Sequence, residues 1–271
     1  MRPLLTLEVH SSLQTARRTG GARVECSLDL GRSASIVEVY DKGWIFRGEH
    51  FPFIENCKDR TIYYWTGASF EAAARFTTSL VKLVPTHYGP PTFEIDGIKM
   101  LPTAYVSPYA DAGRKVDLIG PEGKIVLDTC GGLGYFAAWC IERHAKQVLS
   151  YEKDPNVIWL RSINPWSPQG GDTLTLTQAV IADAIHSIPD KSIEAILHDP
   201  PRFGIAGELY SQAFYKELAR VIKRHGKLFH YTGTPNKLTS GRDVPAEVAK
   251  RLREARFATT FAGDGVLATK K

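Results

Sequence analysis

Four acidic side chains each close a predicted buried strand in the second half of the chain. Asp128 closes "GKIVLD", Glu152 closes "QVLSYE", Asp183 closes "LTQAVIAD" and Asp199 closes "IEAILHD". In a parallel sheet the carboxyl ends of the strands share one edge, and ligands bind outside it. Taken singly, each acid has a structural explanation, such as an ion pair of Glu152 with Lys153 or a helix cap at Asp183. Taken together, they predict a pocket for a ligand that carries ribose hydroxyls, an exocyclic amine and a positive charge.

A glycine-rich turn separates the first of these strands from a predicted helix. The stretch "VLDTCGGLGYFA", residues 126–137, places Gly131, Gly132 and Gly134 ahead of the free N–H groups of a helix start. It contains G-x-G-x-x-A, so a dinucleotide site is one alternative. Asp128 opposes that alternative, because its carboxylate repels a pyrophosphate and attracts a cationic amino-acid moiety. A purely structural βα turn is the other alternative that this motif leaves open.

The stretch "HDPPRFG", residues 198–204, carries the strongest signal for a reaction site. Asp199 and the carbonyl of Pro200 form a rigid set of acceptors, because proline has a fixed φ and no N–H. They are suited to hold a planar amine or ring, with Phe203 stacked on its flat face for about 1–3 kcal/mol. A rigid loop start is the structural alternative. Arg202 is expected either to contact a phosphate or to pair with Glu208.

The elements that position these residues alternate between strand and helix from about residue 115 onward. Short connections between them predict a parallel sheet with helices on both faces. Residues 1 to about 100 read instead as short strands and turns, and "PPTFEIDGIKM" reads as a hairpin. We therefore predict an α/β fold with a doubly wound, mainly parallel seven-stranded sheet in residues 106–271. A smaller β-rich N-terminal domain, residues 1–105, precedes it and is a candidate for substrate or RNA binding.

The segment from about residue 115 to the C-terminus resembles the class I, Rossmann-like S-adenosylmethionine-dependent methyltransferases. The residues that carry the resemblance are "LDTCGGLGY", Glu152, "ADA" at 182–184 and "DPPRF". The segment that starts at "DPPRFGIAGELY" also looks like predicted archaeal-type methyltransferases that carry a β-rich domain in front. The resemblance implies S-adenosylmethionine as cofactor, S-adenosylhomocysteine as product and no metal.

The resemblance also implies roles for individual residues. The cofactor-binding set is Asp128, Thr129, Gly131, Gly132, Gly134, Tyr135, Glu152 for the ribose, and Asp183 with Ala184 for the adenine. The methyl acceptor is expected at Asp199, Pro200 and Phe203. The segment "SPYADAGRK", residues 107–115, is expected either to close over the methionine moiety through Tyr109 and Asp111 or to serve as an interdomain linker.

Charge and chemistry together indicate the acceptor. Residues 216–271 hold thirteen Lys or Arg against five Asp or Glu, a net charge of +8 in a chain whose total is +5. Such a segment suits a polyanion such as RNA, and a solvated helix surface explains it equally well. Transfer to cytosine C5 needs a cysteine nucleophile, and "HDPPRFG" contains none. We therefore predict methylation of a base nitrogen in RNA, with tRNA as the substrate and guanine as one candidate base.

Two alternatives stay open on the sequence. One is an N-methyltransferase or an aminopropyltransferase-like enzyme that acts on a small-molecule or protein amine, which Arg202 opposes because it would repel a polycation. The other is a non-catalytic RNA-binding module. The four cysteines show no C-x-x-C pair, which argues against a zinc site and a disulfide framework and favours the cytoplasm. No apolar run is long enough to span a membrane.

Overall fold

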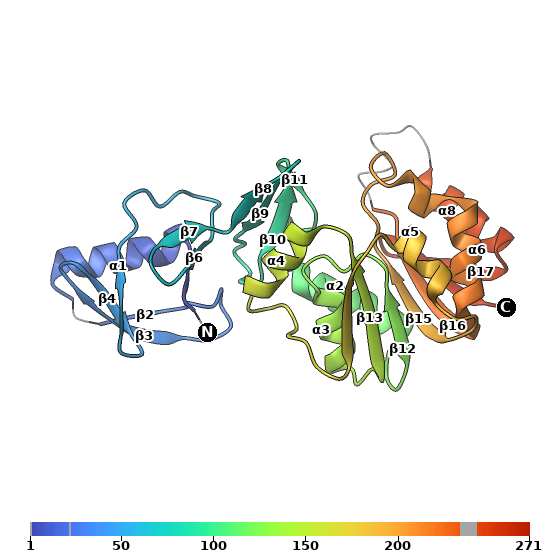
Figure 1. Cartoon of the computed structure of the whole chain (residues 1–271), viewed down its shortest axis with the longest axis horizontal. Helices are drawn as coiled ribbons and strands as arrows, with labels where there is room; N and C mark the ends of the chain where they lie inside the picture. Colours follow the sequence, from blue (N-terminus) through green and yellow to red (C-terminus); the bar gives the residue numbers. More distant parts are fainter. Residues whose placement is uncertain (1, 22, 234–242) are drawn as a thin grey trace. The chain divides into compact units, whose positions relative to one another are not determined.

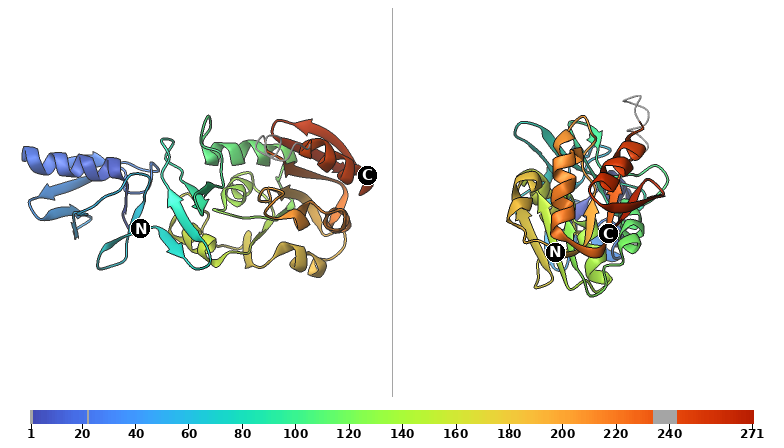
Figure 2. Two further views of the ribbon diagram at one scale, coloured as in Figure 1. Left: turned by 90° about the horizontal axis from the view of Figure 1, so that it is seen from above. Right: turned by 90° about the vertical axis from the view of Figure 1, so that its right-hand side faces the viewer.

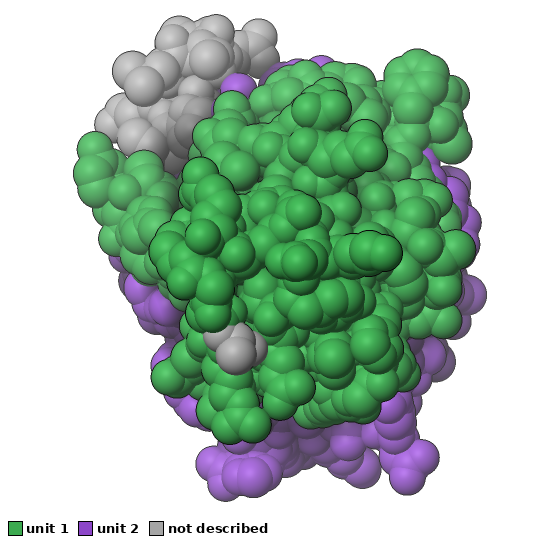
Figure 3. Space-filling model, turned by 90° about the vertical axis from the view of Figure 1, so that its left-hand side faces the viewer, with its two compact units in different colours: residues 1–109, 159–166 green, residues 110–158, 167–271 purple. Residues whose placement is uncertain are grey.

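The computed structural model describes residues 2–21, 23–233 and 243–271. Two compact units make up the chain, one of residues 1–109 with 159–166 and one of residues 110–158 with 167–271 (Figures 1 and 3). The short segment 159–166 packs into the first unit through its two tryptophans. The ring of Trp159 lies 5.5 Å from that of Tyr64, and the ring of Trp166 lies 5.2 Å from that of Tyr109.

The N-terminal unit is rich in β-structure, as predicted. Its elements are β1 (Leu4–Leu5), α1 (Leu7–Thr19), β2 (Arg23–Cys26), β3 (Ser35–Tyr40), β4 (Gly43–Phe46), β5 (Glu49–Pro52), β6 (Tyr63–Trp65), β7 (Phe70–Ala72), β8 (Ala74–Phe76), β9 (Leu80–Val84), β10 (Thr92–Ile95) and β11 (Ile98–Lys99). They form three sheets, with strand orders β1-β6-β7, β2-β3-β4-β5 and β11-β10-β9-β8. Trp44, wholly buried, stacks on Phe51 in the core beside Leu13 of α1.

Two local features of this unit follow from residue chemistry. The predicted hairpin turn joins β10 to β11 through Asp96 and Gly97, whose φ angles of +49° and +77° suit a two-residue hairpin loop. Helix α1 is absent from the sequence predictions, because its polar sequence shows little apolar periodicity. Its ends were nevertheless readable: Thr6 Oγ1 accepts from the Val9 N–H at 3.4 Å, and Gly20 closes the helix with φ +68°.

The elements from residue 108 onward alternate between helix and strand. They are α2 (Pro108–Ile119), β12 (Ile125–Asp128), α3 (Tyr135–Glu142), β13 (Gln147–Glu152), α4 (Pro155–Ile163), β14 (Leu174–Gln178), α5 (Ile181–Ala184), η1 (Ile185–Ser187), β15 (Ile193–His198), η2 (Gly207–Tyr210), α6 (Gln212–Val221), β16 (Ile222–Tyr231), α8 (Val244–Glu254), β17 (Phe257–Ala262) and β18 (Gly265–Lys270). The strands form one seven-stranded sheet in the order β14-β13-β12-β15-β16-β18-β17. All neighbours are parallel except β18, which runs antiparallel to both β16 and β17. The predicted mainly parallel, seven-stranded α/β sheet is therefore confirmed.

Helices cover both faces of this sheet (Figures 1 and 2). Helices α5, α6 and α8 share one core with Leu127 and Ile196, which are register partners on neighbouring strands and fully buried. Helix α3 packs on β12 and β13, and α2 lies tightly against α3. A Cβ on Gly113 of α2 would lie 2.7 Å from the indole of Trp139, so only glycine allows this approach.

The stretch "LTQAVIAD" is not one strand, which corrects the predicted position of Asp183. Strand β14 ends at Gln178, and α5 begins at Ile181, so Asp183 lies in the first turn of a short helix and is exposed. Ile181 and Ile185, four residues apart, are both buried in the sheet core. The apolar run that resembled a strand is therefore the buried side of a helical turn.

Candidate active site

The sheet topology places two of the predicted acids at the point where the strand order reverses. The chain enters the sheet at β12, continues outward through β13 and β14, and then returns to β15 on the other side of β12. Asp128 is the last residue of β12, and Asp199 directly follows β15. The Thr129 N–H donates to the Leu197 carbonyl at 3.1 Å and joins the two strand ends. Ligands of open α/β sheets bind at such a switch point.

The glycine turn after β12 is tied to the end of β13. The Gly131 N–H donates to the Tyr151 carbonyl at 2.7 Å, and the Gly132 N–H donates to Glu152 Oε2 at 2.9 Å. Gly132 and Gly134 have φ angles of +49° and +80°, a region that favours glycine. The turn therefore requires glycine at these two positions, and its Gly132 N–H holds the Glu152 carboxylate beside it.

Both oxygens of Glu152 accept backbone hydrogen bonds, the second from the Asp154 N–H at 2.9 Å. Burial raises the pKa of Glu152, and these donors offset part of that rise. Asp128 is 1% exposed, and its Oδ2 accepts from the Ser150 hydroxyl at 2.8 Å. Tyr135 opens α3 and is buried. The carboxylates of Asp128 and Glu152 are therefore held in fixed orientations by hydrogen bonds.

The third carboxylate sits on a loop that is anchored to the core. Pro200 is buried, and the Tyr210 hydroxyl donates to the Pro201 carbonyl at 3.1 Å. Phe203 is half-buried, with its ring edge-on to that of Tyr210 at 5.5 Å. Arg202 is exposed, and among the described residues no ion pair joins it to Glu208.

Three of the four acids lie around the glycine turn, because backbone hydrogen bonds tie the residues after Asp128 to the ends of β13 and β15. Burial raises the pKa of the Cys130 thiol well above the ordinary value, and the negative charges of Glu152, Asp128 and Asp199 raise it further. All three carboxylates therefore act on one side chain in the glycine turn. Asp183 and Ala184 stand apart in α5, where Asp183 is exposed and Ala184 is half-buried.

Sequence reasoning missed the cation at this site. Lys115 of α2 is buried, and its Nζ lies 2.8 Å from Asp111 Oδ2, 3.5 Å from Asp199 Oδ2 and 3.9 Å from Asp264 Oδ2. Only the spacing of four residues from Asp111 to Lys115 was readable as a helical ion pair. Nothing local in the sequence joins Asp199 to Asp264.

Two buried histidines, His198 and His230, lie near the ends of β15 and β16. His198 Nε2 donates to the Leu209 carbonyl at 3.1 Å, which leaves Nδ1 as the acceptor that faces Thr129 Oγ1 at 2.7 Å. The ring of His230 lies 4.4 Å from that of His198, and its Nε2 accepts from the Tyr215 hydroxyl at 2.9 Å. Burial lowers the pKa of His198 to about 4 and that of His230 well below its usual value, so both rings are neutral near pH 7.

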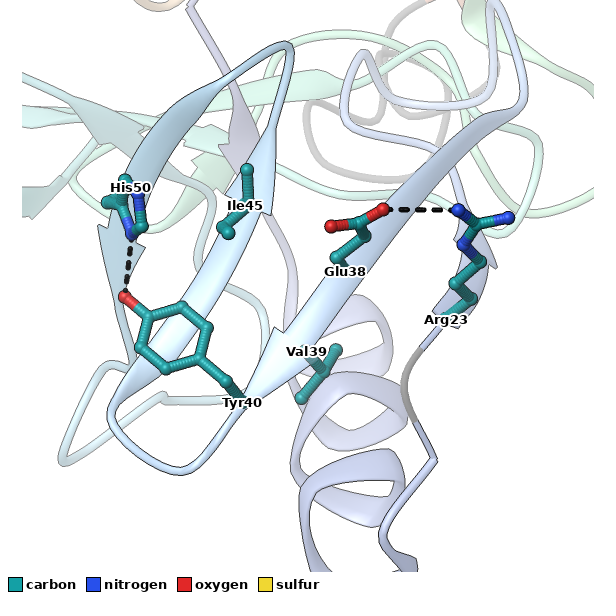
Figure 4. A pocket seen from close by; sticks show the side chains of 6 residues that line it. All are labelled: Arg23, Glu38, Val39, Tyr40, Ile45 and His50. Atoms are coloured by element: carbon teal, nitrogen blue, oxygen red, sulfur yellow. Dashed lines mark hydrogen bonds and ion pairs between the residues drawn. The ribbon is translucent and has the colours of Figure 1, made fainter.

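The N-terminal unit carries a separate hollow on the outer face of sheet β2-β3-β4-β5. It has a volume of about 400 Å³ and is lined by Arg23, Glu38, Val39, Tyr40, Ile45 and His50 (Figure 4). Arg23, Glu38, Ile45 and His50 form one row across the four strands by register. Tyr40 Oη lies 3.1 Å from His50 Nδ1, and Arg23 pairs with Glu38 at 3.3 Å. This face carries two aromatic rings, those of Tyr40 and His50, and side chains of both charges.

Within residues 2–21, 23–233 and 243–271, no cluster of three or more His, Cys, Asp or Glu side chains is arranged to hold a metal ion. The helices among these residues are too short or too polar to cross a membrane.

The C-terminal unit has a Rossmann-like, methyltransferase-type fold, which its strand order defines. Spermidine synthase in complex with the transition-state analogue AdoDATO is similar over 73% of this chain and 73% of its own, with a TM-score of 0.59 and 17% identity. Spermidine synthase from Thermotoga maritima is similar over 73% of this chain and 71% of its own, with a TM-score of 0.56 and 16% identity. At these identities the likeness is one of fold.

The chain belongs to the same family as the uncharacterized protein MJ1233 of Methanocaldococcus jannaschii. The two are 44% identical over 200 residues, which make up 72% of this chain and 68% of the other. No model of a known protein family matches the chain.

Proposed function

We propose that this protein is an S-adenosylmethionine-dependent methyltransferase that acts on a base nitrogen of RNA, with tRNA as the first substrate to test. The observation that carries the proposal is the placement of Asp128, Glu152 and Asp199 around one glycine turn at the switch point of the sheet. Three carboxylates around a tight turn suit a nucleoside that bears a positive charge, and they oppose a pyrophosphate.

The Glu152 and Asp128 carboxylates and the glycine turn offer contacts for the ribose and for the amino-acid moiety of this cofactor. Each oxygen of Glu152 keeps a lone pair beyond its backbone hydrogen bond, so the carboxylate can take two ribose hydroxyls. We propose that Asp128 holds the amino-acid ammonium beside the backbone of Thr129, Gly131, Gly132 and Gly134. Tyr135 completes that turn, and Asp183 with Ala184 remains the proposed contact to the adenine. When bound, the cofactor supplies a methyl group already activated on a positively charged sulfur.

The residues after β15 position the acceptor. The Asp199 side chain is 18% exposed at the carboxyl edge of the sheet, which we call the mouth of the site. There its carboxylate can accept a hydrogen bond from an amino group on the acceptor. Pro200 fixes the backbone, and Phe203 offers a ring to one flat face of a base. Positioning is the contribution required of the protein here, and misplacement by about 1 Å can cost about 10²-fold in rate.

The chemistry of Cys130 favours a nitrogen acceptor. Its thiol is the one cysteine in the glycine turn, and its raised pKa keeps it protonated near neutral pH. A protonated thiol is a poor nucleophile, so covalent attack on a pyrimidine ring has no support from this residue. The basic segment 216–271 supports a polyanionic substrate. The Tyr40 and His50 face of the N-terminal unit is the proposed second RNA contact.

The test is incubation of total small RNA with the protein and labelled cofactor, followed by mass spectrometry of nucleosides. Wild type should add a methyl group to one nucleoside, and Asp199→Asn should lose about 10²-fold or more of that activity. Asp190→Asn is the matched control, because Asp190 is an exposed carboxylate paired with Arg220 and should leave the rate unchanged. Methylation of a metabolite extract but of no RNA nucleoside would overturn the RNA proposal.

Aminopropyl transfer to an amine is the second candidate, and the fold likeness to spermidine synthase favours it. Its test is incubation with an aminopropyl donor and putrescine. Product formation there, without RNA methylation, would replace the first proposal. RNA binding that survives Asp199→Asn, with no turnover by wild type on either substrate, would indicate a binding module instead. RNA affinity should also fall steeply with salt.

A further inference from the structure

The ammonium of Lys115 lies 3.5 Å from Oδ2 of Asp199, the carboxylate proposed to contact the acceptor. Its side chain is 2% exposed, and three carboxylates from separate elements surround it. Asp111 comes from α2, Asp199 from the end of β15, and Asp264 from the turn between β17 and β18. The ring of Tyr231, at the end of β16, lies 3.9 Å from Nζ and covers another side of it.

Asp111 and Asp264 are held in place by contacts that do not involve Lys115. The backbone carbonyl of Asp264 accepts from the Thr232 N–H at 3.1 Å and from the Gly233 N–H at 3.0 Å, which fixes its turn. Arg114 donates to Asp111 at 3.0 Å and to Asp264 at 2.7 Å from the outer side. The cage is therefore built by four elements, and only its central cation is contributed by the flexible chain of a lysine.

The charges of this cluster nearly cancel. Three carboxylates face Lys115 and Arg114, which leaves one net negative charge. Burial by itself would lower the pKa of Lys115, but the charges of Asp199, Asp111 and Asp264 outweigh burial and raise it. Lys115 is therefore an ammonium at every pH near neutrality. A second ammonium brought to Asp199 would meet a like charge 3.5 Å from that carboxylate, in a cluster with only one negative charge left.

We infer that Lys115 is a positioning residue whose ammonium fills a preformed cage of Asp111, Asp199, Asp264 and Tyr231, so that the mouth takes an uncharged acceptor and excludes an ammonium. The inference about the acceptor rests on the proposed methyl transfer, whereas the geometry of the cage is independent of that proposal. A heterocyclic or aryl amino nitrogen of a base is uncharged near pH 7, whereas a polyamine is a cation. The same lysine thus separates the two candidate functions at one position.

The test removes the Lys115 ammonium by substitution and supplies a small ammonium ion from solution in its place. Lys115→Ala deletes three methylene groups and the ammonium, which together have the size of propylammonium. Millimolar propylammonium should raise the thermal unfolding midpoint of Lys115→Ala, because a ligand that binds only the folded state stabilises it. 1-Propanol, its uncharged counterpart, should have no such effect. In the RNA assay, Lys115→Ala should lose at least about tenfold in methyl transfer, and propylammonium should restore a large part of it.

Lys223→Ala is the matched control, because Lys223 pairs with Glu194 on the outer surface of the same unit and should show no response to propylammonium. If Lys115→Ala keeps the circular dichroism of wild type and propylammonium does not stabilise it, the cage inference is wrong, whatever the substrate. If propylammonium stabilises it but no RNA is methylated by wild type, the cage stands and the proposed substrate fails.

A measurement on wild type covers the case in which Lys115→Ala does not fold. Millimolar putrescine should leave the unfolding midpoint of wild type unchanged, since the ammonium of Lys115 already pairs with Asp199. Stabilisation by putrescine that Asp199→Asn abolishes would overturn the inference, because it would show an ammonium bound at the same carboxylate.

Discussion

Lowering the pH from 7 to 5 should destabilise the C-terminal unit through His198. Its ring is wholly buried, and burial lowers its pKa from 6.5 to about 4, while the hydrogen bond to the Leu209 carbonyl opposes only part of that effect. The pKa in the folded state is below that in the unfolded state. Between these values the unfolded chain binds a proton that the folded protein does not, so stability is lost as the pH falls.

The size of the effect follows from the same two pKa values. With a His198 pKa of 6.5 in the unfolded chain and about 4 in the folded protein, proton linkage lowers the free energy of unfolding by about 2 kcal/mol from pH 7 to pH 5. His230 adds to it with the same sign, because burial and the neighbouring His198 lower its pKa as well. The assay is urea denaturation followed by circular dichroism at both pH values.

Two variants separate this residue from the rest of the protein. His198→Gln should be less stable than wild type at pH 7, but its further loss on acidification should be smaller by about 2 kcal/mol. His225→Asn is the control, since His225 is exposed with φ +65°, a conformation that Asn tolerates. Its pH dependence should match wild type. Equal losses in wild type and His198→Gln between pH 7 and pH 5 would refute the assignment of a neutral, buried ring.

Two further substitutions test the packing and the cofactor turn. Gly113→Ala should lower the free energy of unfolding by about 1–3 kcal/mol, because its Cβ would lie 2.7 Å from Trp139. Gly170→Ala is the control and should change the free energy of unfolding little, because nothing lies within 4 Å of its Cβ. Equal stabilities of the two variants in urea denaturation would contradict the close packing of α2 on α3. Glu152→Gln should weaken S-adenosylhomocysteine binding in calorimetry by about 1.5–3 kcal/mol, since it removes a charged acceptor from the turn, and unchanged affinity would remove Glu152 from the proposed ribose contact.

The sequence by itself determined the type and order of the elements in the sheet and the two turns that flank its switch point. The runs ending at Asp128, Glu152 and His198 are apolar enough to be read as strands, and the glycines that follow Asp128 need no tertiary contact to indicate a turn. Hydrophobic periodicity predicted no helix at α1, because apolar residues are few there. At Ile181 it predicted a strand, because a short apolar run fits the period of a strand and that of a helix equally well.

Only the tertiary structure decided which charges meet. Lys115, Asp199 and Asp264 lie far apart in the chain, and their approach depends on α2, the end of β15 and the β17–β18 turn converging on one edge of the sheet. Burial of His198 and of Cys130 likewise follows from packing around them, and packing shifts their pKa values. Local residue patterns carry backbone preference and periodicity. Electrostatic coupling depends on distance in space and on exclusion of water, which arise only when the elements assemble.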